Sequence, residues 1–334
     1  MRLFSLLASG IFVATASTAL AQHATQYPLQ LENCGMELTF TEAPQRAVGI
    51  GQNSSEILLL LGLADRMVGT ATWVSPVLEE VAADNEKVPR LADSTASYEA
   101  ILGTEPDFIA AQFGMRDEAG NREQYADLGI PSYISPTTCA MKDASNGDGV
   151  RLEPWTSELL YQEISELAAI FNVNERGAEL VSELRSREAA VRTQLGKRAA
   201  GLSMVFWFSS PEISGDAWVA GRNGASAYMM EVLGARNIVD SEEDWPLVSW
   251  EAIAAADPTV IVVGTMDRRN RPADDPAVKM EFLQTDPMVS QLSAVQADHL
   301  VLLDAQAMNP TLRTIGGLET LAEALQSQGL LPWR

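Results

Sequence analysis

Continuous apolar runs, bounded by turn-forming residues, dominate the hydrophobic pattern of this chain. The clearest runs are residues 108–111 (Phe-Ile-Ala-Ala) and 260–263 (Val-Ile-Val-Val), and an acidic-Pro pair precedes each. A short apolar run between turn signals is typical of a strand that is buried on both faces, as in a parallel sheet covered by helices. The pattern therefore predicts an α/β fold with parallel-rich sheets.

The segments around these two runs also match each other. Residues 97–101 (SYEAI) and 249–253 (SWEAI) align without a gap, and each begins with a Ser that suits a helix N-terminus. Two further pairs match in the same order: 56–62 with 228–234, which predict a helix ended by glycine and then a strand, and 125–134 with 292–303, which predict a helix and then a strand. Three matches in one order indicate two similar α/β lobes.

A helical connector is predicted between the lobes. Residues 156–198 contain no run typical of a buried strand and are rich in Ala, Glu, Leu and Arg. Apolar positions from Leu180 to Leu195 mark one face of a helix of about 21 residues, which at about 1.5 Å per residue would reach about 30 Å and act as a stiff spine. We divide the chain into residues 1–21, an N-terminal lobe at 22–155, the connector at 156–198 and a C-terminal lobe at 199–334, with a ligand cleft between the lobes.

The first 21 residues have the pattern of an export signal. Arg2 precedes an apolar stretch that ends in the small-x-small sequence Ala19-Leu20-Ala21. We therefore expect cleavage after Ala21 and a periplasmic mature protein. The alternative is a membrane anchor, but the apolar run at 3–14 is shorter than the roughly 20 residues that a spanning helix needs. No later segment approaches that length, so no direct membrane insertion is expected.

Length and charge narrow the possible partners. A chain of 334 residues suits two domains, and its 45 acidic against 23 basic side chains give a formal net charge of −22. This balance disfavours the phosphate contacts that dominate nucleic-acid affinity. Neither a G-x-S-x-G nor an H-E-x-x-H motif occurs, which disfavours an enzyme. The only histidines of the mature chain are His23 and His299, which disfavours a site for a bare divalent metal.

The two cysteines are Cys34 and Cys139. An even number of cysteines in a chain bound for an oxidising compartment predicts a disulfide between them. A metal site built from cysteine is the weaker alternative.

Ligand-binding residues are expected in the loops after the predicted strands, because parallel sheets bind ligands beyond the carboxyl ends of their strands. Aromatic, Met and Arg side chains recur there, which suits an organic ligand with apolar surface and anionic or oxygen-rich groups. The candidates are Ser54, Trp73, Phe113, Arg116, Trp207, Phe208, Trp218, Arg222, Trp245, Met266, Arg268 and Arg313. Alternatives stay open for some of them: Trp207 and Phe208 also suit the core at a strand end, and Arg268 begins a basic run that also suits a solvated loop.

These segments resemble a known family, the periplasmic solute-binding proteins of ABC importers of the cobalamin and ferric-siderophore type. The resemblance rests on residues 43–48 leading to 56–62, on 91–107, and on 234–237 with 250–263. It implies two Rossmann-like lobes joined by a long helix, with no intrinsic cofactor. It also implies capture of a ferric siderophore, corrinoid or similar organic ligand, which would carry any iron or cobalt. A carrier of a bare metal ion is the alternative, and an exported enzyme is less favoured.

The resemblance further implies an ABC permease and its ATPase as partners of a monomeric carrier. One acidic residue on each lobe would then contact the permease: Glu79 or Glu80 on the first lobe and Glu231 on the second. Charges at the rim of an interface steer and register a partner of opposite charge. Ordinary solvated carboxylates are the alternative for all three.

Overall fold

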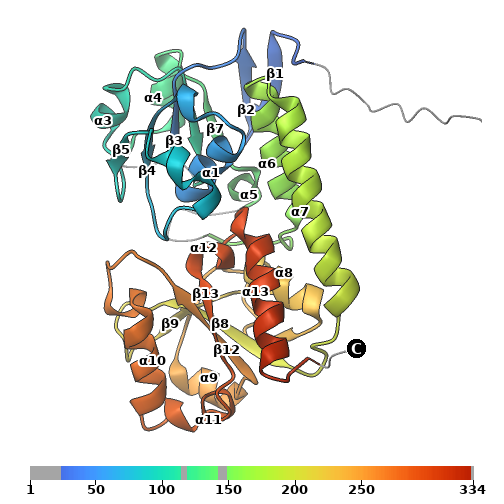
Figure 1. Ribbon diagram of the computed structural model, residues 1–334. Helices are drawn as coiled ribbons and strands as arrows, with labels where there is room; N and C mark the ends of the chain where they lie inside the picture. Colours follow the sequence, from blue (N-terminus) through green and yellow to red (C-terminus); the bar gives the residue numbers. More distant parts are fainter. Residues whose placement is uncertain (1–23, 114–118, 142–148, 332–334) are drawn as a thin grey trace, which may run out of the picture.

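The computed structural model describes residues 24–113, 119–141 and 149–331 of the chain. It shows two α/β lobes, one above the other, beside a long helix (Figure 1). This arrangement confirms the predicted fold class. The predicted export signal at residues 1–21 lies outside the described residues. Among the helices described, none combines the length and the apolar character that a membrane crossing would require.

The first lobe is built on a parallel sheet. Across this sheet the order is β5 (Arg90–Ala92), β4 (Met67–Ala71), β3 (Ala47–Ile50), β6 (Phe108–Ala111) and β7 (Ser132–Ile134), and each neighbouring pair is parallel. The connecting elements are α1 (Gln52–Leu60), η1 (Ala64–Arg66), η2 (Glu79–Val81), α2 (Ala82–Asn85), α3 (Tyr98–Leu102), α4 (Arg122–Asp127) and α5 (Pro136–Cys139). Every residue of β6 is buried, as expected of a strand that is covered on both faces.

The second lobe has a mixed sheet in the order β11 (Leu247–Val248), β9 (Ala217–Val219), β8 (Ser203–Ser209), β12 (Val260–Thr265) and β13 (Leu300–Asp304), and β10 (Arg236–Asn237) also pairs with β8. β12 is parallel to β8 and β13, whereas β9 is antiparallel to β8 and β11. The other elements are α8 (Ala225–Leu233), α9 (Trp250–Ala256), η5 (Pro272–Asp274), α10 (Pro276–Thr285), η6 (Val289–Gln291), α11 (Ser293–Gln296), α12 (Ala305–Met308) and α13 (Arg313–Ser327).

The matching sequences form matching elements. Ser97 accepts a hydrogen bond from the backbone N–H of residue 100 at the start of α3, and Ser249 accepts one from residue 252 at the start of α9. Gly62 follows α1 with φ 77°, and Gly234 caps α8 with φ 81°. Positive φ favours glycine at helix ends, which explains why the same signal recurs in both lobes. The sheets differ at one edge, because β9 and β11 add antiparallel strands to the second lobe only.

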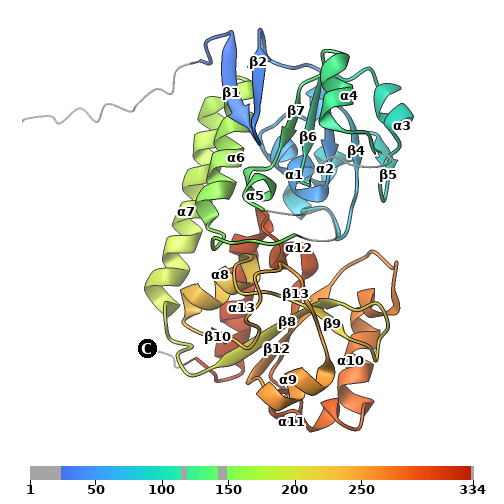
Figure 2. The same ribbon diagram turned by 180° about the vertical axis from the view of Figure 1, so that it is seen from behind.

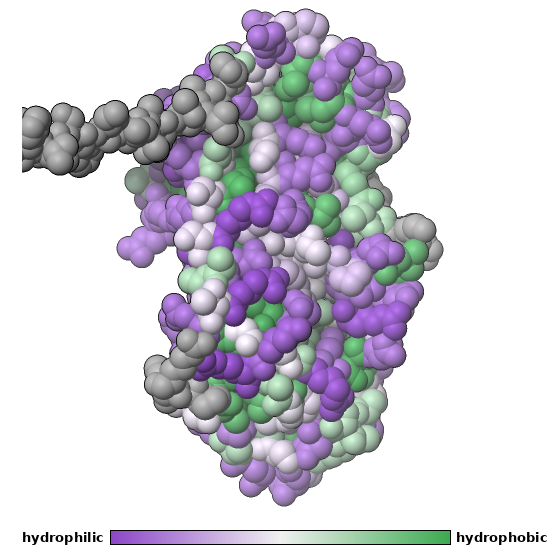
Figure 3. Space-filling view, turned by 90° about the vertical axis from the view of Figure 1, so that its right-hand side faces the viewer, coloured by the Kyte–Doolittle hydropathy of each residue, from purple (hydrophilic) through white to green (hydrophobic). Residues whose placement is uncertain are grey.

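The connector contains α6 (Ser157–Ile170) packed against α7 (Asn174–Leu195), and α7 runs alongside both lobes (Figure 2). The predicted apolar face of α7 is buried at Leu180, Leu184 and Val191. On the side of the molecule that carries α7, the surface is mainly hydrophilic with smaller hydrophobic patches (Figure 3). The long helix therefore buries one side against the lobes and presents the other to solvent.

The predicted disulfide between Cys34 and Cys139 is present, with a Cα–Cα distance of 5.0 Å. It joins the turn of the hairpin formed by β1 (Leu29–Asn33) and β2 (Met36–Phe40) to the end of α5. The neighbouring Asn33 reinforces this attachment, because its side chain exchanges two hydrogen bonds of 2.8 Å with the backbone of Ile134. The hairpin is thus fixed to the edge of the first sheet.

Replacing Cys34 and Cys139 together with Ala should lower the free energy of unfolding by about 2 to 4 kcal/mol, because the disulfide closes a long loop and restricts the unfolded chain. Urea unfolding of the oxidised protein and of the double variant would measure the difference. Equal stability would contradict this effect. Two free thiols in the denatured, unreduced protein would show that the disulfide does not form.

Candidate functional site

The two lobes meet through loops at the ends of their strands. Val74, in the loop after β4, packs in an apolar cluster with Met266, after β12, and with Ala305 and Phe208. The backbone carbonyl of Val74 also accepts hydrogen bonds from the N–H groups of Asp267 (2.9 Å) and of the next residue (3.0 Å). The carboxyl ends of the two sheets therefore face a common region between the lobes, where a ligand cleft is expected in this type of fold.

Aromatic rings of the second lobe line this region. Phe208, near the end of β8, packs against Trp245 with the ring centroids 4.8 Å apart. The indole N–H of Trp245 donates to the side-chain oxygen of Asn309 at 3.0 Å. The guanidinium of Arg268 lies 5.7 Å from the centre of the Phe208 ring. We call Phe208, Trp245 and Arg268 the aromatic wall, which combines apolar rings with a cation.

A buried carboxylate, Asp274, holds Arg268 in place. Its oxygens accept hydrogen bonds from Arg268 Nε at 3.2 Å, from Ser209 Oγ at 2.6 Å and from the backbone N–H of Asn270 at 3.0 Å. Burial by itself would raise the pKa of Asp274, but the hydrogen bonds from Ser209 and Arg268 outweigh it and lower the pKa. Asp274 is therefore ionised at neutral pH and fixes the loop that carries Arg268.

Each lobe also has a tryptophan covered by an arginine. Arg90 lies 4.6 Å from the ring centre of Trp73 in the first lobe, and Arg271 lies 4.5 Å from that of Trp218 in the second. Trp73 is buried, and its indole N–H points to the hydroxyl of Thr70 at 3.3 Å. Trp218 is partly exposed on β9, which lies between β8 and the edge strand β11.

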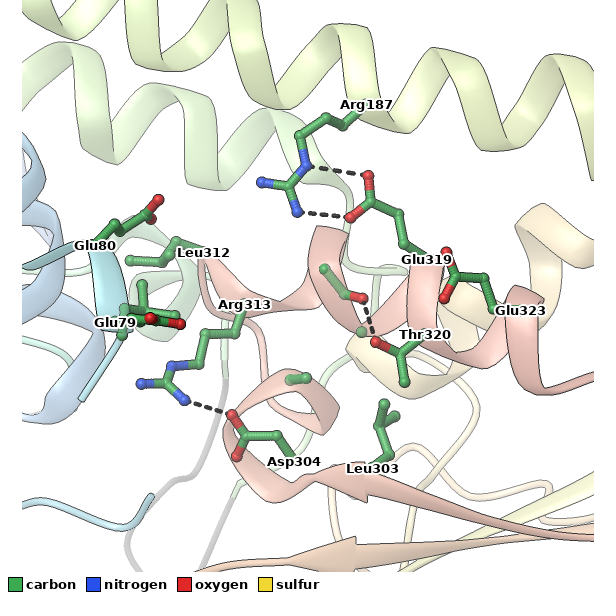
Figure 4. A pocket seen from close by; sticks show the side chains of 14 residues that line it. Glu79, Glu80, Arg187, Leu303, Asp304, Leu312, Arg313, Glu319, Thr320 and Glu323 are labelled. Atoms are coloured by element: carbon green, nitrogen blue, oxygen red, sulfur yellow. Dashed lines mark hydrogen bonds and ion pairs between the residues drawn. The ribbon is translucent and has the colours of Figure 1, made fainter. Parts of the chain in front are cut away.

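Arg313, at the start of α13, belongs to an ion-pair network between the lobes. Its Nε donates to Glu56 of α1 at 2.9 Å, and its Nη2 contacts the other oxygen of the same carboxylate. Further bonds reach Asp304 at 2.5 Å and the carbonyl of Pro76 at 2.6 Å, and Figure 4 shows the contact with Asp304. Side chains and backbone of the protein itself occupy several of the Arg313 donors, and its predicted contact with a ligand stays a prediction.

A second polar network reaches from the connector to the second lobe. Asn53 of α1 accepts a hydrogen bond from the backbone N–H of Leu312 at 2.8 Å and donates to both oxygens of Glu163 at 3.3 Å. Glu163 lies in α6 and also accepts a bond from Ser135 at 2.6 Å. Its burial raises its pKa to about 7, although the bonds from Ser135 and Asn53 oppose that shift. The connector is thus linked to both lobes through buried polar side chains.

Trp207 lies in the core of the second lobe. Its side chain is fully buried and packs edge-on against Trp250, with 4.8 Å between ring centroids. β8 continues to Ser209, so residue 207 lies within the strand and not in a loop. Because side chains alternate along a strand, Trp207 packs in the core on one face while Phe208 reaches the aromatic wall. This placement fits the alternative of a core residue near a strand end, and the predicted ligand contact of Trp207 stays a prediction.

The remaining candidates lie in different surroundings. Ser54 is buried within α1, Met266 is buried in the apolar cluster between the lobes, and the side chain of Phe113 is 51% exposed. Arg222 is exposed and forms ion pairs with Asp240 and Glu242. Arg116 lies outside the described residues. Asp274 was not among the predicted site residues, although an acidic residue that follows the basic run beginning at Arg268 indicates a partner for that run.

The acidic residues predicted to contact a permease are exposed on both lobes. Glu79 and Glu80 lie in η2 and line a cavity of about 860 Å³ beside the ion pair of Arg187 with Glu319 (Figure 4). Glu231 lies in α8, 3.6 Å from the guanidinium of Arg192. Across the described part of the chain, no group of three or more His, Cys, Asp or Glu side chains is arranged to hold a metal ion.

Comparison with known proteins gives a consistent set of matches. Residues 48–307 match the model of a family described as periplasmic binding protein. The chain is 22% identical to the uncharacterized ABC transporter substrate-binding lipoprotein YvrC of Bacillus subtilis, over 91% of this chain and 87% of YvrC. It is 22% identical to a cobalamin-binding protein of Halobacterium salinarum, over 93% and 78% of the two chains. A crystal structure titled as an ABC-type Fe³⁺-hydroxamate transport system, from Saccharomonospora viridis, is 26% identical, with a TM-score of 0.74 over 90% of this chain and 99% of that chain.

Replacing Arg313 with Met should lower the free energy of unfolding by about 3 to 5 kcal/mol, because Glu56 would stay buried without its partner. The double variant Glu56→Gln with Arg313→Met should lose less than the single variant, since no unpaired charge is left. Urea unfolding measures both.

The matched control is Arg185→Met, which removes an exposed ion pair with Glu158 and should cost at most about 1 kcal/mol. If Arg313→Met costs no more than this control, the contact between Arg313 and Glu56 does not stabilise the arrangement of the lobes.

Proposed function

This chain belongs to the periplasmic binding protein family, and from that premise we propose that it captures a bulky organic or metal-chelate anion between its lobes and delivers it to an ABC permease. The matching relatives include a substrate-binding lipoprotein of an ABC transporter and a cobalamin-binding protein, which supports a carrier and not an exported enzyme. The observation that carries the ligand class is the aromatic wall, where Phe208 and Trp245 pack together beside Arg268. Rings bind flat apolar surface, and a guanidinium binds anionic oxygens.

A ferric siderophore, a corrinoid or a haem-like molecule has this combination of properties. The relatives named for cobalamin binding and for Fe³⁺-hydroxamate transport support the same chemical class. Iron or cobalt would then enter the site only as part of the ligand. Transport of a bare metal ion is the competing function, and the experiment below separates the two.

We also propose that the mature protein is periplasmic and monomeric and reaches the ATPase only through the permease. The export pattern that ends at Ala21 and the description of the matching family support this location.

Titration with a panel of one ferric hydroxamate, one ferric catecholate, haemin and cyanocobalamin should give saturable quenching of tryptophan fluorescence by at least one compound, because Trp245 belongs to the aromatic wall. Phe208→Ala should weaken binding of that compound by about 3- to 10-fold, as expected for loss of one aromatic contact. Trp250→Phe is the matched control, since Trp250 is buried in the separate core cluster. If none of the four compounds binds and divalent metal salts do, the protein carries a bare metal ion.

Replacing Glu79, Glu80 and Glu231 with Lys should abolish stimulation of the transporter's ATPase and leave affinity for the panel compound unchanged. The reason is that rim charges register a basic partner surface without contacting the cleft. Glu281→Lys is the matched control, because Glu281 is also exposed but lies on α10. Unaltered stimulation would exclude the three residues from docking, and lost ligand affinity would indicate that they contribute to the cleft instead.

A further inference from the structure

A lysine with no solvent exposure, Lys279, lies directly behind the aromatic wall. It belongs to α10, and its ammonium donates hydrogen bonds to the backbone carbonyls of Phe208 and, at 2.8 Å, of Gly264. These carbonyls are near the ends of β8 and β12, the neighbouring parallel strands that lead to the ligand-facing loops. One side chain therefore connects two strand ends to a helix behind them.

The surroundings of Lys279 are unusual for an ammonium group. The nitrogen lies 5.3 Å from the ring centre of Trp207, and the charged groups that act on it are Asp274 of η5 and Arg268 of the loop after β12. β8 contributes the uncharged Ser209, which is bonded to Asp274. Burial lowers the pKa of Lys279 to about 7, Asp274 opposes this shift, and Arg268 reinforces it.

We propose that Lys279 is a positioning residue for ligand binding: by bonding the carbonyls near the ends of β8 and β12, it fixes Phe208 and the 265–268 turn in the geometry that the ligand meets. The role toward the ligand rests on the proposed function above, whereas the fixing of the two strand ends does not. Asp274 fixes Arg268 by accepting a hydrogen bond from its guanidinium, and Lys279 fixes Phe208 by donating one to its backbone carbonyl. The two buried charged groups therefore hold the aromatic wall from the side away from the ligand.

Protonation of Lys279 changes the charge behind the aromatic wall without breaking its hydrogen bonds to the two carbonyls. A neutral amine still has two N–H groups, so both bonds can persist after deprotonation, and a rise in pH removes only the positive charge. Because an anion at the aromatic wall favours that charge, affinity for an anionic ligand should fall as the pH rises through about 7. Folding responds in the opposite direction. Since the folded-state pKa lies below the unfolded value, the unfolded chain binds more protons above pH 7, and the contribution of Lys279 to stability rises with pH there.

The first experiment needs no ligand. Tryptophan fluorescence of the wild-type protein between pH 5.5 and 8.5, a range chosen to span about 1.5 pH units on either side of the pKa, should show a transition near pH 7, because the ammonium lies beside Trp207. Lys279→Met and Trp207→Phe should each remove it. In Lys279→Met, amide hydrogen exchange at residues 207–210 and 264–268 should be about tenfold faster, because both carbonyls lose a donor. Lys87→Met is the matched control, since Lys87 is exposed and paired with Asp84.

The second experiment uses haemin and the other compounds of the panel. Wild-type affinity for an anionic compound should fall about tenfold between pH 6 and pH 8, as expected for loss of one nearby buried charge. Lys279→Met should bind about tenfold more weakly at pH 6, with no dependence on pH in this range. Equal binding by Lys279→Met and the wild type at both pH values would overturn the ligand role.

The two experiments distinguish failure of the proposed function from failure of the structural role of Lys279. If no compound binds, the proposed function fails, and the exchange and fluorescence measurements still decide the structural role. Unchanged exchange at both strand ends in a folded Lys279→Met variant, or a wild-type transition that persists in that variant, would overturn the proposal itself. Should Lys279→Met fail to fold, the same exchange measurement on Lys279→Gln, which is neutral and one atom shorter, decides the structural role.

Discussion

The buried ion pair between Arg313 and Glu56 is a direct charged contact between the two lobes. The Arg313 side chain is 9% exposed and that of Glu56 is 1% exposed, so neither charge can be satisfied by water alone. An ion pair of this kind gives little net stability but is costly to break, and it therefore specifies one arrangement of the groups that form it. The connector joins the lobes along one side, and this contact fixes them at a second place, inside their interface.

A chain of contacts links this ion pair to the aromatic wall. Asp304 pairs with Arg313 and also accepts a hydrogen bond from Ser75, next to Val74 in the loop after β4. Val74 in turn accepts two backbone hydrogen bonds from the loop that carries Arg268. A shift of α13 relative to α1 would therefore change the position of Arg268, because the intervening contacts are hydrogen bonds with little freedom in length.

Local signals made the fold predictable, whereas long-range contacts decided the site. Ser97 and Ser249 form the helix N-termini that their neighbours indicate, and the glycines at 62 and 234 adopt the positive φ that ends a helix. These features depend on a few consecutive residues. A position in a loop after a strand was a weaker predictor of ligand contact, because it does not indicate which residue a side chain contacts. Arg313 meets a carboxylate 257 positions away in the sequence, a partner that no local pattern reveals.

Arg268 and Arg313 differ in how many of their donors the protein itself occupies. Both contact acidic side chains, but Arg313 spreads its donors over Glu56, Asp304 and a carbonyl. Asp274 contacts Arg268 from behind, from within the same lobe, and the Arg268 side chain keeps 26% of its surface exposed. A guanidinium has five N–H donors, so a carboxylate on one side leaves others for an anionic ligand. The two arginines therefore differ in where a counter-charge lies: Asp274 belongs to the same lobe as Arg268, whereas Glu56 belongs to the lobe opposite Arg313.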